Sequence, residues 1–356
     1  MRVLFFTASV NIGGIERVFL SYATGLMAEG HDVHYVVCQE WGKMSLGLPD
    51  GLKLHCLDNV RLRYSVLKLR KLLQKIKPDI IITGNDSTLV PYLANLMIFG
   101  KKAKIITSQH SYYNNNETLF YSRFILKYIY PKCNKVIAVS SGIAEMLNQE
   151  FNMKEPFVKV INNPVDINII DRDSKLSLNH SGIPPKYVTF VGRMTPVKNI
   201  KFLIDSFCLF AEKRRDISLI LVGDGYERKE LEEYADSKSL NGRILFVGVQ
   251  SNPYSYIYNS ELLLLPSLSE AYPTVLIEAM RLGVTCVCTP TLGAIDILSG
   301  GKYGYIANSF NDKFEYAQLM EHALDNKIDS TMLYDLVEQK YSLRAKVLDL
   351  INFINN

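Results

Sequence analysis

The sequence predicts an α/β fold made of two doubly wound domains in tandem. Three observations lead to this prediction: short apolar segments alternate with helical patterns in the first half, the alternation stops near residue 165, and it then starts again. Short apolar strands separated by helices are typical of a parallel sheet with helices on both faces. A length of 356 residues suits two domains that each bury a core. We therefore expect domains over 1–165 and 166–335, with two rows of strand ends facing a central cleft.

The first half is expected to hold five buried strands, each short, apolar and rich in β-branched residues. They are Val3–Thr7, Val33–Val37, Asp79–Thr83, Lys104–Ser108 and Val136–Val139. Helices are expected over Gly14–Ala28 and, with many cations, over Ser65–Lys75. The segment Asn162-Asn-Pro-Val-Asp166 breaks the pattern, and a polar stretch follows it to about Pro185. We expect that segment and stretch to be the hinge between the domains.

The second half repeats the alternation. Strands are expected at Tyr187–Val191, Ser218–Val222, Ile244–Val247, Leu262–Leu265 and Val284–Cys288, and helices are expected to begin near Asn199, Tyr226, Pro253 and Thr274. Because parallel strands end at one edge of a sheet, the loops after these strands should form a ligand site.

The bulk composition narrows the class of protein. Hydrophobic residues make up 48% and charged residues 21%, as in a globular protein, and no apolar run approaches the ~18 residues that span a bilayer. The chain enters a strand directly after Met1, so no signal peptide is expected. The six cysteines show no metal spacing and mostly lie in apolar patterns, which suits reduced thiols in the cytoplasm. The six scattered histidines give no reason to expect a metal site.

Positive charge is concentrated in residues 61–135, which hold 14 Lys or Arg against 3 Asp or Glu, a net of +11 in a chain of net +4. Within 66–77, leucines recur at helical spacing with cations between them. A second segment mixes aromatic and basic residues: Tyr112, Tyr113, Phe120, Tyr121, Arg123, Phe124, Lys127, Tyr128 and Tyr130. Such a surface suits anionic membrane headgroups. The alternative is a core-packed helix with a solvated face. Nucleic acid is disfavoured, because no module that reads it is visible.

Two carboxylates, Glu270 and Glu278, are the most informative feature, with seven residues between them. Glu270 lies in the loop after the strand Leu262–Leu265, and Glu278 lies within the helix expected from Thr274 to about Leu282. Carboxylate oxygens at the carboxyl edge of a sheet suit the hydroxyl groups of a sugar, which are hydrogen-bond donors.

Two cations, Arg193 and Lys198, lie five residues apart in another loop that follows a strand. A guanidinium fork and an ammonium point charge there could clamp a diphosphate, whereas the alternative is a pair of solvated surface cations. In Gly223-Asp-Gly225, glycine on both sides of Asp224 predicts a tight turn, so we expect this segment to have a structural role.

In the first half, Gly13 and Gly14 follow the first strand and open a helix, where backbone can approach a phosphate closely. The alternative is a turn that lets helix pack on sheet. His110 follows the strand Lys104–Ser108 and could bond a sugar hydroxyl, although an ordinary packed histidine is the alternative.

Taken together, these motifs resemble the retaining glycosyltransferases of family 4, and the match covers nearly the whole chain. Its most specific part is the carboxylate pair with the flanks Pro266-Ser-Leu-Ser-Glu270 and Glu278-Ala-Met280. The resemblance implies the GT-B fold, in which two Rossmann-like doubly wound domains face a central cleft. It also implies that residues 336–356 form a helix crossing back to the first domain. The form Tyr272-Pro273-Thr274 looks like transferases of bacterial surface-polysaccharide and glycan assembly.

The resemblance also implies a role for each residue. Glu278 would hold the ribose of the donor nucleotide, and Glu270 would accept hydrogen bonds from the donor sugar. Arg193 and Lys198 would neutralise the departing diphosphate. The remaining donor contacts would come from Gly13 and Gly14 at the diphosphate, His110 at the sugar, Val249 and Gln250 near the base, and the loop Ala271, Tyr272, Pro273, Thr274 and Val275 at sugar and phosphate.

These features predict a retaining, metal-independent transferase without a cofactor. It would move a hexose or N-acetylhexosamine from a nucleotide sugar, with UDP the expected nucleotide, to a polyprenyl-linked or other nascent surface glycan, at the inner face of the cell membrane. Glu270 is not assigned as a nucleophile, because attack on the same face as the leaving group is expected for this family. One alternative is a UDP-sugar 2-epimerase, whose extra carboxylates and histidine we do not find. The other is a non-catalytic binder of nucleotide sugars or polyanions.

Overall fold

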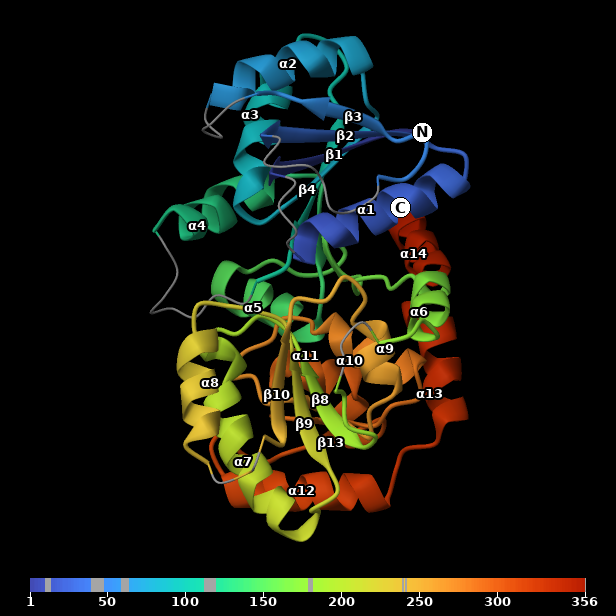
Figure 1. The fold of residues 1–356 in the computed structure, drawn as a ribbon. Helices are drawn as coiled ribbons and strands as arrows, with labels where there is room; N and C mark the ends of the chain where they lie inside the picture. Colours follow the sequence, from blue (N-terminus) through green and yellow to red (C-terminus); the bar gives the residue numbers. More distant parts are fainter. Residues whose placement is uncertain are drawn as a thin grey trace. The chain divides into compact units, whose positions relative to one another are not determined.

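Figure 1 shows the computed structural model, which describes residues 1–9, 14–39, 48–58, 64–111, 120–178, 182–238, 240 and 242–355. The chain divides into two compact units. The first comprises residues 1–164 together with 343–356, and the second comprises 165–342. Each unit contains its own parallel sheet.

The sheet of the first unit has the strand order β3-β2-β1-β4-β5-β6-β7. Its strands are β1 (Arg2–Ser9), β2 (Asp32–Gln39), β3 (Lys53–Cys56), β4 (Ile80–Gly84), β5 (Lys104–Gln109), β6 (Lys135–Ala138) and β7 (Val158–Val160). All neighbouring pairs are parallel. Because β2 and β3 extend the sheet to one side of β1 and β4 to β7 extend it to the other, the order reverses between β1 and β4. Ligands bind at such a switch point in open α/β sheets.

Alternate residues of β1 build two separate cores in this unit. Val3 and Phe5 pack with α1 (Gly14–Ala28) and α14 (Leu343–Asn355). Leu4 and Phe6 lie on the opposite face with α2 (Ser65–Ile76) and α3 (Leu89–Leu96). The period of two along a strand thus lets one short apolar segment bury both faces of the sheet.

The C-terminal helix belongs to the first unit. Val347, Leu350, Phe353 and Ile354 of α14 are buried in the same core as the apolar face of α1. Figure 1 shows the two helices next to each other. The return to this unit begins at Leu343, and residues 336–342 stay with the second unit.

The first unit contains further helical segments. They are the 3-10 turn Asn85–Thr88, α4 (Phe120–Phe124), the π-helical turn Ile125–Ile129, the 3-10 turn Tyr130–Lys132 and α5 (Ser141–Phe151). Ser140 caps α5 by accepting a hydrogen bond from the Ile143 amide at 3.4 Å.

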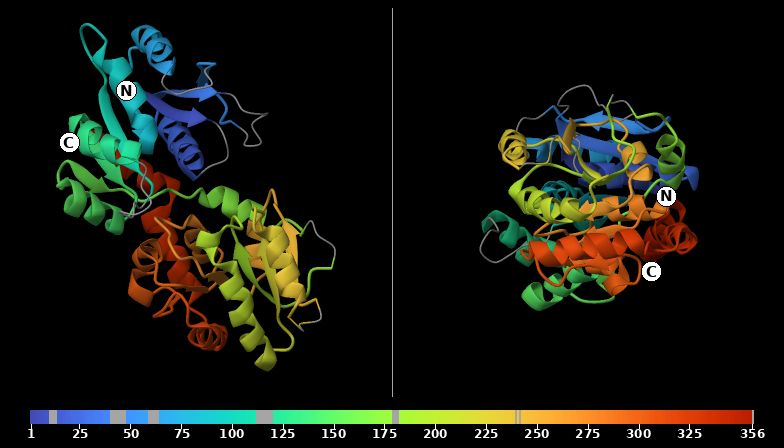
Figure 2. Two further views of the ribbon diagram at one scale, coloured as in Figure 1. Left: turned by 90° about the vertical axis from the view of Figure 1, so that its left-hand side faces the viewer. Right: turned by 60° about the horizontal axis from the view of Figure 1, so that its bottom comes forward.

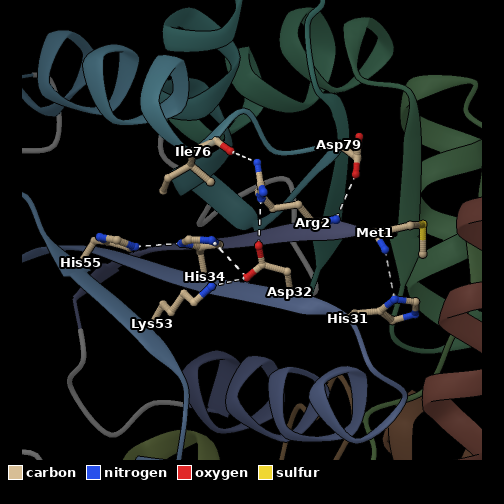
Figure 3. A network of polar contacts seen from close by, with 9 residues as sticks. All are labelled: Met1, Arg2, His31, Asp32, His34, Lys53, His55, Ile76 and Asp79. Carbon is tan, nitrogen blue, oxygen red and sulfur yellow. Dashed lines mark hydrogen bonds and ion pairs between the residues drawn. The ribbon is translucent and has the colours of Figure 1, made fainter.

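A charged network ties the strand starts of the first sheet together (Figure 3). Asp32 at the start of β2 pairs with Arg2 of β1 at 2.9 Å and with Lys53 of β3 at 2.7 Å. These two cations hold the pKa of the Asp32 carboxyl well below its usual range. His34 lies 3.4 Å from the same carboxylate, and its ring also contacts His55 at 2.9 Å. The network lies at the amino ends of the strands, the edge opposite to the one where ligands bind.

The sheet of the second unit has the order β10-β9-β8-β11-β12-β13. Its strands are β8 (Tyr187–Val191), β9 (Ser218–Val222), β10 (Ile244–Gly248), β11 (Leu263–Leu265), β12 (Cys286–Cys288) and β13 (Tyr305–Ile306). All pairs are parallel. The order reverses between β8 and β11, which places the switch point there.

Helices surround this second sheet, as Figures 1 and 2 show in the yellow-green to red part of the chain. They are α6 (Ile167–Ser174), α7 (Ile200–Lys213), α8 (Arg228–Asp236), α9 (Tyr254–Tyr258), α10 (Thr274–Arg281), α11 (Leu292–Ile297), α12 (Lys313–Asp325), α13 (Ser330–Leu336) and the π-helical turn Val337–Tyr341. Helix α7 packs on α8 and α12, whereas α10 packs on α6, α9 and α13.

The predicted fold class is confirmed, since two parallel α/β sheets follow one another and every expected strand is present. The hinge interpretation holds for the segment Asn162–Asp166, because the two units divide between residues 164 and 165, but it is wrong for the polar stretch that follows. The polar stretch that we assigned to a hinge contains helix α6, which begins directly after its cap Asp166. Asp171 of α6 binds Arg281 of α10 at 2.5 Å. The polar stretch is polar because it includes the solvated face of a helix that packs on the second unit.

Three further properties concern only the residues that the structure describes. No helix among them combines the length and the apolarity needed to cross a membrane. They contain no cluster of three His, Cys, Asp or Glu side chains that could hold a metal ion. All six cysteines are free thiols, and four of them are buried.

Candidate active site

Two loops meet at the switch point of the second sheet. The loop after β8 carries Arg193 and Lys198, and the loop after β11 carries Glu270. The Leu268 amide donates to the Val197 carbonyl at 2.8 Å, so backbone joins the two loops directly. Residues more than 70 positions apart in the sequence are thereby held together at the sheet edge.

Lys198 and Glu270 form an ion pair across these loops. The Lys198 Nζ donates to Glu270 Oε1 at 2.5 Å, and only 21% and 12% of the two side chains are exposed. A pair so removed from water interacts more strongly than one on the open surface, because screening is weaker. The two side chains predicted to bind diphosphate and sugar are therefore adjacent.

The Glu270 carboxylate is held on one oxygen only. Ser267 Oγ donates to the same Oε1 at 2.7 Å, and Thr289 Oγ1 in turn donates to the Ser267 carbonyl at 2.5 Å. Both bonds of the carboxylate within the described part of the chain go to Oε1. Its Oε2 keeps lone pairs for a ligand.

Gly293 of α11 lets the Glu270 loop lie close to that helix. Its amide donates to the Glu270 carbonyl at 3.1 Å. A Cβ at this position would come within 2.8 Å of the carbonyl oxygens of Glu270 and Ala271 and 2.7 Å of Pro273 Cδ. Sequence reasoning missed Gly293 and Thr289, because neither belongs to the motif, and quoted Ser267 only as a flank. The spacing of Ser267 three residues before Glu270 was the available signal.

Arg193 is exposed on the other loop of the switch point, beside the turn at residues 223–225. A Cβ at Gly223 would lie 1.9 Å from the Gly192 carbonyl oxygen, and one at Gly225 would lie 2.0 Å from the Met194 carbonyl oxygen. The Met194 amide donates to the Asp224 carbonyl at 2.8 Å. The two glycines thus allow the close approach that positions the Arg193 backbone.

The next loop along this edge follows β10. The Gly223 amide donates to the Gly248 carbonyl at 2.8 Å, which joins this loop to the glycine turn. Val249 is 74% exposed. The side-chain amide of Gln250 donates to the Val247 carbonyl at 2.6 Å. The exposed Val249 side chain therefore offers an apolar surface next to the polar side chain of Gln250.

The segment predicted to contact sugar and phosphate leads into helix α10. Tyr272 and Pro273 are buried, whereas Ala271, Thr274, Val275 and Glu278 are half-buried. Helix α10 begins at Thr274 and keeps Glu278 one turn inside it. Tyr272 packs inside the unit, so its side chain supports the loop, and the neighbouring backbone and Glu278 remain partly accessible.

His110 follows β5 in the first unit. Its Nε2 lies 2.8 Å from Ser108 Oγ, and its backbone amide donates to Asn85 Oδ1 at 2.9 Å. Phe19 packs against the His110 ring in an edge-to-face arrangement, with 5.9 Å between the two ring centroids. Burial lowers the pKa of the His110 imidazole from 6.5 to about 3, so the ring is neutral near pH 7.

The glycines after β1 complete the predicted set. Gly14 is the exposed first residue of α1, and a Cβ there would meet no atom of the described residues within 4 Å. Gly13 lies outside the described residues, as do Tyr112 and Tyr113 of the predicted aromatic surface. Among the described residues, no packing neighbour accounts for glycine at position 14.

Two family models match this chain and together account for most of it. The model described as Glyco_transf_4, Glycosyltransferase Family 4, matches residues 12–169. The model described as Glycosyl transferases group 1 matches residues 177–340. The chain belongs to glycosyltransferase family 4. Its two Rossmann-like sheets are those of the GT-B fold.

Individual relatives of this glycosyltransferase are distant but match along its length. A Campylobacter jejuni "N-acetylgalactosamine-N,N'-diacetylbacillosaminyl-diphospho-undecaprenol 4-alpha-N-acetylgalactosaminyltransferase" is 24% identical, over 97% of this chain and 95% of the relative. A second C. jejuni protein, "GalNAc-alpha-(1->4)-GalNAc-alpha-(1->3)-diNAcBac-PP-undecaprenol alpha-1,4-N-acetyl-D-galactosaminyltransferase", is 27% identical, over 92% of this chain and 90% of the relative.

Among solved structures, Anabaena Alr3699/HepE in complex with UDP and glucose has a similar fold. The TM-score is 0.84 at 19% sequence identity, covering 100% of this chain and 99% of that one. The similarity concerns the fold, since identity is low.

The switch-point geometry of this family 4 glycosyltransferase combines three chemical capacities at one sheet edge. Lys198 and Arg193 supply positive charge, Glu270 Oε2 supplies hydrogen-bond acceptors, and Glu278 supplies a second carboxylate one turn into a helix. Such a set suits a ligand that is anionic at one end and rich in hydroxyl groups at the other.

Proposed function

We propose that this glycosyltransferase moves a sugar from a nucleoside diphosphate sugar, with UDP as the nucleotide, to a lipid-linked glycan. The observation that carries the proposal is the contact between Lys198 and Glu270 at the switch point of the second sheet. One partner suits the diphosphate and the other suits the sugar, and the two parts are adjacent in such a donor. The UDP and glucose bound to the similar Anabaena fold support the choice of nucleotide.

The chemical step follows from where charge develops. The bond between the anomeric carbon and the diphosphate oxygen breaks, leaving positive charge on the sugar and negative charge on the diphosphate. Lys198 and Arg193 stabilise the diphosphate as that charge grows, and preorganised groups of this kind are worth several kcal/mol. Two protein cations supply this neutralisation, so the proposed reaction uses no metal and no cofactor.

Retention of the anomeric configuration is part of the proposal. The acceptor hydroxyl forms its bond to the anomeric carbon on the face that the diphosphate leaves, and its proton passes to a departing phosphate oxygen. Glu270 accepts hydrogen bonds from the donor sugar through Oε2 and forms no covalent bond. The products are the nucleoside diphosphate and a glycan longer by one sugar.

The remaining donor contacts are assigned in the same way. Glu278 binds the ribose hydroxyls, and Val249 and Gln250 lie beside the base. The backbone from Ala271 to Val275 contacts sugar and phosphate. Gly14, with its open Cβ position, allows the diphosphate to approach, and His110 bonds a hydroxyl of the donor sugar.

The acceptor is proposed to be a glycan on a polyprenyl diphosphate, as the names of the two Campylobacter relatives describe for those proteins. The transferred sugar is a hexose or an N-acetylhexosamine. An acceptor of this kind is anchored in a membrane, so the enzyme must work at a membrane surface.

The first unit offers a surface that suits such a membrane. Phe99 is 91% exposed after α3 and Phe120 is 87% exposed at the start of α4. Exposed side chains of the same region include Tyr64, Leu67, Leu96, Met97, Tyr121, Phe124 and Tyr128. Lys101, Lys102 and Lys127, from the same stretch of the sequence, are exposed as well. Exposed aromatics with cations match an interface of acyl chains and anionic headgroups. We therefore assign these exposed side chains within residues 64–111 and 120–128, the aromatic-basic surface, to peripheral membrane contact.

A single assay separates the proposal from its rivals. The full chain is incubated with a panel of nucleotide sugars, with and without a polyprenyl diphosphate glycan in anionic vesicles, and released nucleoside diphosphate and the glycan are measured. Acceptor-dependent UDP release with an α-linked product supports the proposal. Conversion of a UDP-N-acetylhexosamine to its 2-epimer without acceptor would favour an epimerase. Donor binding without turnover of any nucleotide sugar would leave a binding protein.

A further inference from the structure

The Ser108 hydroxyl lies between two groups in the first unit. Its Oγ is 3.2 Å from the Thr83 carbonyl oxygen and 2.8 Å from His110 Nε2. Ser108 is buried, with 3% of its surface exposed. A hydroxyl carries one proton, so it can donate to only one of these two groups.

The chemistry of the two partners decides the direction. A carbonyl oxygen only accepts, so the contact with Thr83 needs the Ser108 proton. The remaining contact is satisfied only when His110 Nε2 carries a proton and donates it to Ser108 Oγ. The opposite arrangement would leave two oxygens in contact without a proton between them, which is unfavourable for a buried group.

The ring is also fixed in place by its surroundings. Gly84 makes room for the hydroxyl, because a Cβ there would lie 2.9 Å from Ser108 Oγ. Asn85 holds the His110 backbone, and Phe19 packs against the ring edge. The other ring nitrogen, Nδ1, makes no hydrogen bond with any residue in the described ranges.

We propose that Ser108 is a positioning residue that holds His110 in the Nε2–H tautomer, so that Nδ1 is presented as a hydrogen-bond acceptor. This inference rests on the proposed function for the identity of the group that Nδ1 meets, a hydroxyl of the donor sugar. His110 then recognises a donor hydroxyl by accepting its proton in a hydrogen bond, and a group that can only accept is rejected at this position.

The tautomer is measured directly by nitrogen NMR on the full chain labelled with 15N-histidine. A protonated ring nitrogen and an unprotonated one differ widely in chemical shift, and the His110 signal is assigned by its loss in His110→Gln. We expect the Nε2–H form in the wild type and a shift toward Nδ1–H in Ser108→Ala. Ser111→Ala is the matched control, because Ser111 Oγ accepts from Asn85 Nδ2 at 3.1 Å, and among the described residues it makes no hydrogen bond with the ring.

Turnover gives the second readout. Ser108→Ala should lower kcat/KM for the donor about tenfold, the effect of one hydrogen bond, with a folded protein. Ser108→Thr keeps the hydroxyl and should restore activity. A donor analogue that lacks the recognised hydroxyl should lose this difference between wild type and Ser108→Ala, which a merely structural role would preserve.

The inference is overturned if the wild type shows Nδ1–H, or if Ser108→Ala leaves the tautomer unchanged. Both results come from the free protein and need no substrate. Failure of the proposed function would instead appear as absent turnover with the NMR result intact, so the two failures are distinguishable.

Discussion

The first six strands of each unit lie in the same order in the sheet, but the carboxyl edges of the two sheets carry different chemistry. In the second unit, the loops after β8 and β11 hold the ion pair of Lys198 and Glu270. In the first unit, the strand ends of β4 and β5 hold a neutral imidazole, a hydroxyl and an amide, from His110, Ser108 and Asn85. The shared topology supplies the place, whereas the loop residues decide whether charge or neutral hydrogen bonding is offered there.

The largest expected effect comes from removing either member of the Lys198–Glu270 ion pair in the second unit. Glu270→Gln and Lys198→Ala should each lower kcat about 10²- to 10³-fold, because each removes a preorganised charge beside the reacting bond. Steady-state UDP release measures this. Lys213→Ala is the control. Lys213 of α7 pairs with Glu321 of α12 at 3.1 Å but is 66% exposed, so the activity of this variant should equal that of the wild type. Full turnover in both site variants would contradict the proposed function.

The next effect distinguishes Gly293, which close packing requires, from Gly14, whose Cβ position has no described neighbour. Gly293→Ala pushes a methyl group against the Glu270 loop, so the free energy of unfolding should fall by about 1–3 kcal/mol. Gly14→Ala meets no neighbour among the described residues and should change that energy by less than about 0.5 kcal/mol, while weakening binding of the donor. Urea unfolding and UDP-sugar titration measure the two quantities. Equal destabilisation by both changes would disprove the distinction.

A smaller effect tests whether the His110 imidazole of the first unit is neutral. The pKa of His110 falls from 6.5 to about 3 on folding, so the unfolded chain binds a proton below pH 6.5 that the folded chain refuses. This group's contribution to stability is therefore complete above pH 6.5 and is lost as the pH falls toward 3, by at most about 1.4 kcal/mol per pH unit.

Unfolding of wild type and His110→Gln between pH 7.5 and 5 checks this expectation. The wild type should lose more stability than the variant, and the comparison cancels the contributions of His34 and His55, whose pKa values burial also lowers. Parallel pH profiles of the two proteins would show that His110 is not held neutral by burial.

The smallest effect concerns the outer surfaces of the two units. Phe99→Ser and Phe120→Ser should each weaken binding to anionic vesicles about fivefold, the loss of one partly inserted aromatic ring. Phe314→Ser, which is 61% exposed in the second unit, should leave vesicle binding unchanged. Co-sedimentation at two salt concentrations measures both. If all three variants bind alike, the aromatic-basic surface is not the membrane contact.

Much of the fold could be predicted because the period of the apolar residues is local information. Helix α1 runs over Gly14–Ala28 and strand β9 over Ser218–Val222, as expected. Three strands were not predicted: β3, β7 and β13. Each has only two to four residues, too few for a periodic pattern, and each forms because a neighbouring strand offers it a partner.

The sequence by itself determined the α/β class, the tandem repeat of the alternation and the residue types at the strand ends, since these depend on spacing along the chain. Only the tertiary structure decided that Lys198 contacts Glu270, that Ser267 donates to the same carboxylate oxygen while Thr289 holds the Ser267 carbonyl, and that the Ser108 hydroxyl contacts His110 Nε2. Hydrogen bonds of this kind depend on which loops meet at a sheet edge, and that meeting is a property of strand order in space.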